Sequence, residues 1–143
     1  MDAADRAILK ALAKNARTPI KQLAQDAYLS SPATSTRLER LEKSGVIKGY
    51  QAKLDLQLLG FHILAFVNIA LPPERKAALV EFADACPNVL ECHYVTGNYS
   101  MILKVAFRST KDLETFVGHL QTYGNTQTQV VFSTQIEPRQ IVE

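Results

Sequence analysis

One short segment of the chain combines hydroxyl and basic side chains at helical spacing. The segment is Ser31 to Gly45, with the sequence SPATSTRLERLEKSG. Small hydroxyl side chains near a helix start fit into the major groove of DNA, and arginines a turn further on reach phosphates or a guanine edge. The residues predicted to contact DNA are Ser31, Pro32, Ser35, Thr36, Arg37, Arg40, Lys43 and Lys48. Among them, Arg37, Lys43 and Lys48 are expected to bind phosphates, and the others to lie at the groove.

Two helices must be placed close together for this segment to read a groove. Thr18-Pro19 is predicted to start a helix that runs to Ala27, and Ser31-Pro32 a second one that runs to Glu42. A hydroxyl residue followed by proline is typical of a helix start, because the hydroxyl accepts a bond from a free backbone N–H and proline has no N–H to leave unpaired. With only Tyr28 to Ser30 between them, the two helices form the outline of a helix-turn-helix.

Further signals complete a small first domain, predicted to span residues 1–45. An earlier helix is expected to start at the acidic residues Asp2 and Asp5 and to bury an apolar side that includes Ile8. Thr34, Leu38 and Leu41 form the inward side of the last helix, and Gly45 ends it. Residues 46–60 are predicted to be a hinge that contains a strand over Val46 to Leu54, where Tyr50, Ala52 and Leu54 alternate.

Charge is distributed unevenly along the 143 residues. Residues 1–60 hold ten Lys and Arg against six Asp and Glu, a net of +4, whereas the remainder has a net charge of −2. The basic character therefore belongs to the helix-turn-helix half, as expected for DNA binding. With no apolar run long enough to span a membrane and a polar N-terminus, a cytoplasmic, nucleoid-associated protein is expected. Cys86 and Cys92 are expected to be buried free thiols.

The second domain, residues 61–143, has the pattern of strands alternating with helices. Strands are predicted over His62–Leu71, Val89–Thr96, Met101–Phe107 and Thr126–Ile136, with helices ending at Cys86 and beginning after Ser109. The order βαββαβ is that of a ferredoxin-like fold. The predicted fold class is thus α+β, with an N-terminal helix-turn-helix domain joined to a C-terminal ferredoxin-like domain.

The first of these strands is apolar on both of its sides. Two helices cover only one face of a four-stranded sheet, so the other face also needs a cover. A second copy of the chain fits that requirement and predicts a dimer with sheets packed face to face. A dimer also suits the first domain, because paired helix-turn-helix units read two half-sites on DNA.

The whole chain resembles the Lrp/AsnC, or feast/famine, family of prokaryotic transcriptional regulators. The matching stretches are DRAILKALAKNARTPIKQLAQ, LSSPATSTRLERLEKSGVIKGYQAKLD and VTGNYSMILKV. The resemblance implies a sequence-specific regulator of transcription whose dimers assemble further into tetramers or octamers. It also implies that a small molecule such as an amino acid binds between dimers.

The resemblance also implies a set of effector-binding residues. They are Gly97, Asn98, Tyr99, Ser100, Thr126 and Thr128. Gly97 matches the glycine that opens the family's effector loop. Family members that sense amino acids often have aspartate where this chain has Ser100, and serine supplies no charge to pair with an ammonium group. An alternative follows from this difference, namely an architectural, chromatin-like DNA-binding protein that responds to no effector.

No pattern in the sequence predicts catalysis. There is no nucleophile triad, paired-carboxylate motif, phosphate-binding loop or zinc-ligand spacing, so no catalytic residue, metal or cofactor is expected. Sirohaem decarboxylase subunits look like the same two-domain architecture, but they would require a cavity rich in histidine and arginine. The second domain holds only three arginines, Arg75, Arg108 and Arg139, which makes this enzyme a poor alternative. Its histidines, His62, His93 and His119, are also far apart on different predicted elements.

Overall fold

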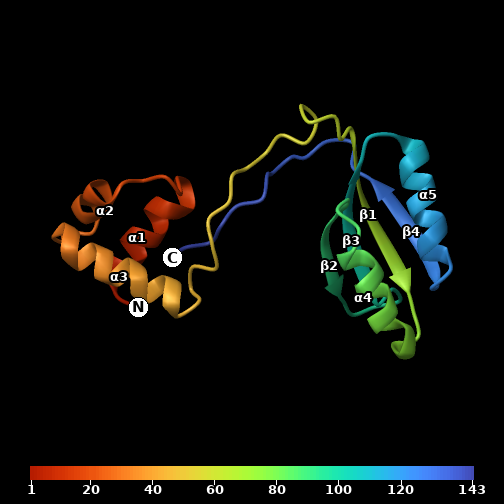
Figure 1. The fold of residues 1–143 in the computed structure, drawn as a ribbon, viewed down its shortest axis with the longest axis horizontal. Coiled ribbons are helices and arrows are strands. Elements are labelled where there is room, and N and C mark those ends of the chain that lie inside the picture. Colours follow the sequence, from red (N-terminus) through yellow and green to blue (C-terminus); the bar gives the residue numbers. More distant parts are fainter. The chain divides into compact units, whose positions relative to one another are not determined.

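The computed structural model describes residues 1–143 and divides them into two compact units. The first unit contains residues 1–53 and 136–143, and the second contains residues 54–135. Figure 1 shows the helices α1 to α3 in the first unit and the sheet with α4 and α5 in the second. The predicted fold class is confirmed. The change from one unit to the other falls inside the predicted hinge, residues 46–60, whereas the grouping of 136–143 with the first unit was not predicted.

Helix α1, Ala3–Lys14, begins at the predicted acidic residues. The Asp2 carboxylate accepts a hydrogen bond from the backbone N–H of Asp5 at 2.9 Å, and the Asp5 carboxylate accepts one from the backbone N–H of Asp2 at 3.1 Å. This reciprocal pair is a capping box, which satisfies two backbone donors that a helix start otherwise leaves free. The capping bonds within α1 therefore already orient both carboxylates, independently of any contact with another helix.

The residues that cap α2, Ile20–Asp26, and α3, Ser31–Lys43, are not the ones predicted from the sequence. Thr18 does not cap α2, because its hydroxyl donates to the carbonyl of Asn15 at 2.6 Å. Ser30, rather than Ser31, caps α3, and its hydroxyl accepts from the N–H of Ala33 at 3.3 Å. The cap therefore lies one residue earlier than predicted, which leaves the Ser31 side chain free of that role.

The three helices bury a small apolar core. Ile8, Leu23, Ala27 and Leu41 are each at most 7% exposed and pack together. Thr34 is also fully buried, and its hydroxyl donates to the carbonyl of Ser30 at 2.9 Å, so this polar group has a partner. This core fixes the angle at which α3 lies against α1 and α2. The opposite side of α3 is exposed to solvent.

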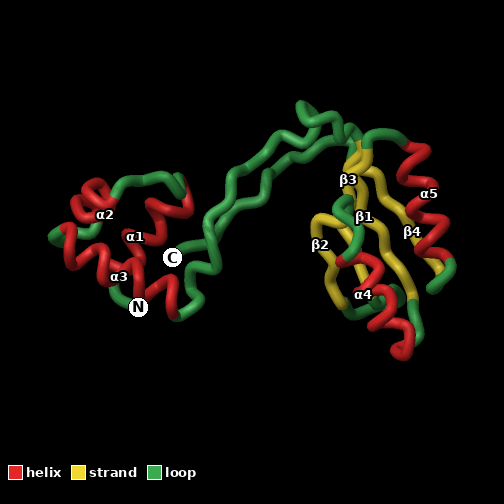
Figure 2. The backbone as a smooth tube through the Cα atoms, in the orientation of Figure 1, coloured by secondary structure: helices red, strands yellow, loops and turns green.

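The segment after α3 contains no strand, so the strand predicted over residues 46–54 is wrong for the single chain. Gly45 ends the helix with φ +77°, as predicted, and Tyr50 donates from its hydroxyl to Glu42 at 2.8 Å. Residues 46–51 and 140–143 line one groove with α1, and the Lys53 ammonium lies 3.4 Å from the Pro138 carbonyl. Figure 2 draws both of these extended stretches as loops that run together. Without a neighbouring ladder, alternation of apolar residues is not sufficient to make a strand.

The second unit is a four-stranded antiparallel sheet with its helices on one face. Its elements are β1 Ile63–Ala70, a 3-10 turn Pro73–Arg75, α4 Lys76–Asp84, β2 Val89–Tyr94, β3 Met101–Phe107, α5 Thr110–Gln121 and β4 Asn125–Val130. The strand order is β2-β3-β1-β4, which is the ferredoxin-like order that the sequence predicts. The last strand ends at Val130 instead of Ile136, and beyond it one further bond, from the Val131 N–H to the Leu64 carbonyl at 2.8 Å, joins the chain to the start of β1.

The core of this unit lies between the sheet and the two helices. Ala65, Val67 and Ile69 of β1 are fully buried on that side, together with residues of β3, α4 and α5. Gly124, in the turn before β4, lies so close to the carbonyl of Ala70 that a Cβ atom would collide with it. The turn between α5 and the sheet therefore requires glycine at this position.

The other face of the sheet carries the alternate residues of each strand and has no helix over it. Leu64 and Phe66 of β1 are half-buried there, and Ile102 of β3 pairs across the sheet with His93 of β2. We call the face that bears these side chains the open face. None of the helices in the chain combines the length and apolar character needed to cross a membrane.

Candidate nucleic-acid interface

The side of α3 that faces away from the core presents most of the predicted DNA contacts. The exposed ones are Ser31, Pro32, Thr36, Arg40, Lys43 and, beyond the helix, Lys48. Ser35 and Arg37 are half-buried. The thirteen-residue helix thus brings together on one side the residue types that position a protein on a phosphate backbone and contact base edges.

The hydroxyl groups on this side differ in what they already bind. Those of Ser31 and Ser35 make no hydrogen bond within the protein, whereas the Thr36 hydroxyl donates to the carbonyl of Pro32 at 3.1 Å. A free hydroxyl can donate to and accept from a base edge, but Thr36 can only accept while its internal bond is kept. Ser31 and Ser35 are therefore the more versatile contacts near the start of the helix.

The two arginines of α3 bind acidic residues at the start of α1. One nitrogen of Arg37, Nη1, lies 2.6 Å from Asp2 and 3.0 Å from Asp5. Arg40 Nη2 donates to both carboxylate oxygens of Asp5, at 3.0 and 2.8 Å. Asp5 is only 1% exposed, so the network holds a buried carboxylate between two helices. Sequence reasoning treated Asp2 and Asp5 only as helix-start residues and missed these pairs.

The network shifts the titration of its members. The backbone N–H of Asp5 and the guanidinium of Arg37 lower the pKa of Asp2 from 3.8 to about 2. Burial alone would raise the pKa of Asp5, but the bonds from the Asp2 N–H and Arg37, with the charge of Arg40, bring it below its usual value. The same acids raise the pKa of Arg37. Both carboxylates therefore remain ionised at neutral pH and keep the arginines oriented.

The lysines near the end of α3 are less constrained. Lys43 lies 3.9 Å from Glu39, one turn earlier, and both side chains are largely exposed. Lys48 is exposed and has no acidic residue within ion-pair distance. An exposed pair at that separation contributes little, so both ammonium groups are free to approach a phosphate.

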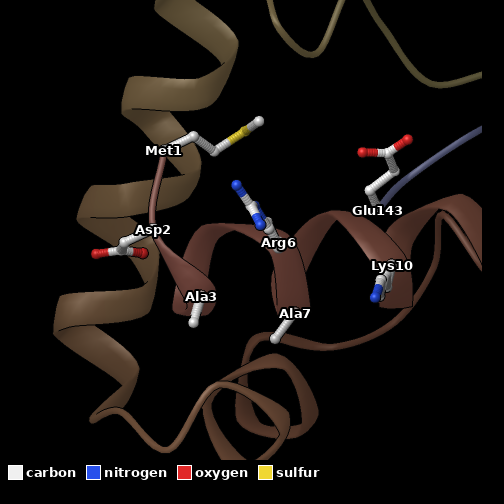
Figure 3. Close-up of a pocket in the computed structure, with 7 residues that line it drawn as sticks. All are labelled: Met1, Asp2, Ala3, Arg6, Ala7, Lys10 and Glu143. Atoms are coloured by element: carbon white, nitrogen blue, oxygen red, sulfur yellow. The ribbon is translucent and has the colours of Figure 1, made fainter.

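Helix α1 adds two basic side chains that sequence reasoning did not include. Arg6 and Lys10 line a shallow pocket of about 410 Å³ with Met1 and the C-terminal residue Glu143. Figure 3 shows Arg6 directed into this pocket, while Asp2 points away from it toward α3. Neither basic residue forms an ion pair. The signal that could have found them is their spacing of one helical turn on a helix whose other residues, apart from Lys14 in its last turn, are apolar or acidic.

The predicted effector residues gather at one end of the sheet in the second unit. Gly97 has φ +107° in the turn between β2 and β3, a conformation that favours glycine. The Ser100 hydroxyl accepts from the N–H of Leu71 at 3.2 Å, and the Ser100 N–H donates to Ile69 at 3.1 Å. Ser100 therefore ties the turn to the end of β1 and already has backbone partners.

Thr126 and Thr128 are on β4, opposite Ile69 and Val67 of β1. Both are half-buried on the helix side of the sheet, and the Thr126 hydroxyl lies 3.4 Å from the side-chain nitrogen of Gln121. Thr126 is thus near the same sheet end as Ser100, with β1 between them, and Thr128 is two residues further along. None of the six predicted effector residues has a charged side chain.

The remaining titratable groups form no evident site. No three His, Cys, Asp or Glu residues are grouped as metal ligands. Cys86 and Cys92 are free and half-buried rather than fully buried, and burial raises the pKa of Cys92. A thiol with a raised pKa is a weaker nucleophile at neutral pH than an ordinary one.

Comparison with known proteins agrees with this geometry. Residues 1–48 match the family model for winged helix-turn-helix DNA-binding, and residues 64–141 match that for the Lrp/AsnC ligand binding domain. The chain is 37% identical to the HTH-type transcriptional regulator YezC of Bacillus subtilis, with 94% of this chain and 95% of that protein aligned.

Two solved structures are similar over almost the whole chain. One is AsnC of E. coli, at 30% identity with a TM-score of 0.90, covering 100% of this chain and 99% of the other. The second is a feast or famine regulatory protein of M. tuberculosis complexed with L-methionine, at 30% identity with a TM-score of 0.89 and 99% of both chains covered. With a family model matched over more than half of its length, the chain belongs to the Lrp/AsnC family of helix-turn-helix transcriptional regulators.

Proposed function

We propose that two copies of the chain, held together through their second units, bind double-stranded DNA with one α3 in each of two major grooves. The observation that carries the proposal is the outer side of α3, where free Ser31 and Ser35 hydroxyls lie beside Arg40 and Lys43. A helix that buries one side in a small domain and presents this set on the other fits the docking of a recognition helix.

The roles of the side chains follow from their surroundings. Ser31, Ser35 and Thr36 are assigned to base edges, with Pro32 packing at the groove. Lys43 and Lys48 are assigned to phosphates, since neither is held by a close internal partner.

The two arginines have a mixed role in this proposal. Arg40 is 62% exposed despite its bonds to Asp5, so its remaining donors can reach DNA. Arg37 is 27% exposed and binds two acids, which supports a role in orienting α3 together with a phosphate contact.

The open face supports the dimer. Leu64, Phe66 and Ile102 place apolar surface on a sheet side that no helix of the chain covers. Packing against the same face of a second chain would remove this surface from water and set the separation of the two α3 helices. Association of dimers into tetramers or octamers is the extension that we propose from the family.

An amino acid is proposed to modulate this assembly, since the M. tuberculosis neighbour was solved with L-methionine. The Gly97 to Ser100 turn with Thr126 and Thr128 is the family's location for such a ligand. We further propose that the chain acts in the cytoplasm on the nucleoid, by binding alone and without catalysis or a cofactor.

The test is fluorescence anisotropy with labelled duplex DNA from the region upstream of the protein's own gene, compared with random duplexes of equal length. We expect tighter binding to the upstream duplex and a footprint of two protected half-sites about one helical turn apart, or a multiple of it. The Ser35→Ala variant should reduce this preference, whereas Thr115→Ala, on the second unit, should not. Equal binding to all duplexes would contradict sequence-specific recognition and favour an architectural role.

A further inference from the structure

The turn between α2 and α3 (Figure 1) holds Tyr28, the one residue other than glycine that has a positive φ, at +55°. The Tyr28 N–H donates to the carbonyl of Gln25 at 3.2 Å, and the N–H of Leu29 donates to the carbonyl of Ala24 at 2.9 Å. This pair of bonds is the Schellman motif that ends many helices, and glycine is the usual residue at the position of Tyr28. A side chain in the left-handed conformation brings its Cβ atom too close to a carbonyl oxygen, so Tyr28 lowers the stability of the turn.

Packing does not compensate for this strain. The Tyr28 side chain is 95% exposed, its hydroxyl makes no hydrogen bond within the protein, and its ring takes part in no aromatic or cation–π pair. The next residue, Leu29, is the one that packs on the core of the three helices. Neither backbone geometry nor burial therefore accounts for a tyrosine at this position, and a strained residue with a free side chain indicates a contact outside the unit.

The place of the turn indicates what Tyr28 contacts. When a recognition helix lies in a major groove, the helix before it crosses the sugar-phosphate backbone. The turn that joins α2 to α3 must therefore pass the edge of the groove, where the phosphates lie. Tyr28 is three residues before Ser31, which is the first residue assigned to the groove. Tyrosine hydroxyls are among the side-chain groups that bind phosphate oxygens.

We propose that Tyr28 is a DNA contact, whose hydroxyl donates a hydrogen bond to a phosphate oxygen at the edge of the groove that α3 occupies. Its ring lies along the deoxyribose next to that phosphate, which removes apolar surface of both molecules from water. The contact positions the protein and carries no information on base sequence. This inference rests on the proposed DNA-binding function and adds to it a residue outside the set predicted from the sequence.

The effect of salt distinguishes this contact from those of the basic side chains. Lysine and arginine release counterions from the phosphates that they bind, and each such contact steepens the fall of log K with the logarithm of the salt concentration. A neutral hydroxyl releases no counterion. Loss of the Tyr28 contact should therefore lower the affinity by the same factor at every salt concentration, whereas loss of a phosphate contact by Lys43 should also reduce the slope.

The test is Tyr28→Phe in the full-length protein, which keeps the ring and removes the hydroxyl. Fluorescence anisotropy with the upstream and random duplexes is measured at several salt concentrations. We expect both affinities to fall by about tenfold, as for loss of a hydrogen bond to a charged group, with the salt slope and the ratio of the two affinities unchanged. Tyr94→Phe is the matched control, because it removes the hydroxyl of an exposed tyrosine in the second unit, and it should change none of these quantities.

The phosphate itself can be located with upstream duplexes in which one phosphate at a time is replaced by an uncharged methylphosphonate. At the phosphate that Tyr28 binds, the replacement should weaken the wild type more than it weakens Tyr28→Phe. Such a difference between the two proteins is the sign of a direct contact, since changes at independent positions add. Equal weakening of both proteins at every phosphate would contradict the contact.

Tyr28→Gly separates a DNA contact from a structural role. Because glycine adopts a positive φ without steric cost, protection of the α2 and α3 amides from hydrogen exchange should rise by about threefold or more. The DNA affinity should nevertheless fall at least as far as in Tyr28→Phe. A variant that is more stable and binds DNA less tightly has not lost binding through unfolding.

Three results would overturn the proposal and leave the DNA-binding function standing. They are unchanged affinity in both Tyr28 variants, weaker binding in Tyr28→Gly together with lower amide protection, and a reduced preference for the upstream duplex in Tyr28→Phe, which would make Tyr28 a reader of bases. Failure of the wild type to prefer the upstream duplex contradicts sequence-specific recognition alone, because the Tyr28 contact is measured on random duplexes as well. Absence of any DNA binding by the wild type would overturn both.

Discussion

Arg40 of α3 and Asp5 of α1 are joined by two hydrogen bonds, from one guanidinium nitrogen to both carboxylate oxygens. They are 35 residues apart in the sequence, and Asp5 is almost fully buried. The bond links the helix that is proposed to read DNA to the first helix of the chain. Asp5 also accepts a hydrogen bond from Arg37, so one acidic side chain sets the position of both arginines.

Asp5→Ala should destabilise the first unit by about 1–3 kcal/mol, because the three hydrogen bonds that its carboxylate accepts from Arg37 and Arg40 are lost, together with the one from the backbone N–H of Asp2. Amide hydrogen exchange of α1 and α3 measures this locally, without requiring the whole chain to unfold in one step. Glu39→Gln, an exposed change on α3, should alter the same exchange by less than about 0.5 kcal/mol. Similar protection in Asp5→Ala and the wild type would show that the ion pairs do not hold α1 to α3.

Arg37→Ala should weaken binding to specific and random DNA alike, and lower the salt dependence of log K by about 0.9 per phosphate lost. Asp2→Asn separates the two roles of Arg37, since it removes an acidic partner and keeps the guanidinium. If Arg37 binds phosphate, Asp2→Asn retains or improves DNA affinity. If Arg37 only orients α3, Asp2→Asn weakens binding as Arg37→Ala does, and the salt slope stays unchanged in both.

The Asp2 carboxyl should titrate in the folded protein with a midpoint of about 2, compared with its ordinary value of 3.8. Because folding lowers this pKa, Asp2 contributes stability that is complete above the ordinary value and is lost as the pH falls toward 2. Carbon-13 NMR of the side-chain carboxyl measures the midpoint directly. In Arg37→Gln the midpoint should move upward, and an unchanged midpoint would show that Arg37 is not the cause.

Two glycines of the second unit should respond to alanine in opposite directions. Gly124→Ala places a Cβ atom against the Ala70 carbonyl and should cost about 1–3 kcal/mol. Gly118→Ala lies in an exposed part of α5 with open space around it and should stabilise by about 0.5–1 kcal/mol. Calorimetric unfolding of both variants decides this, and a neutral Gly124→Ala would mean that the turn relaxes around the new methyl group.

Phe66→Lys should reduce the sedimentation mass of the protein to that of one chain. A charge on the open face cannot be buried against a second sheet without a partner. Val80→Lys is the matched control, because it changes an exposed apolar residue on α4, away from the open face. A dimer that persists in Phe66→Lys would place the interface elsewhere.

The sequence predicted those features that depend on local signals. Asp2, Ser109 and Gly45 mark helix ends through side-chain or backbone preferences that act within a few residues. The βαββαβ order followed from apolar periodicity, because each strand and helix buries one side in the same core.

Features that depend on distant partners were missed or misplaced. The strand predicted after Gly45 has suitable alternation but no neighbour to pair with in the single chain. Tyr28 adopts φ +55° in the turn before α3 without a glycine to signal it. Asp5 binds Arg37, which lies 32 positions further along the sequence, and Arg40, which lies 35 positions further along. Local periodicity gives no information on contacts at such separations.

Asp2 and Asp5, which bind the arginines of α3, also limit how this regulator could be engineered to bind a new DNA sequence. Transplanting α3 from a relative would bring its own side chains next to Asp2 and Asp5, whose geometry is fixed by their capping bonds. A grafted helix without arginines at positions 37 and 40 would leave a buried carboxylate uncompensated. The unit of exchange in specificity engineering is therefore the pair of helices, α1 with α3, rather than the recognition helix alone.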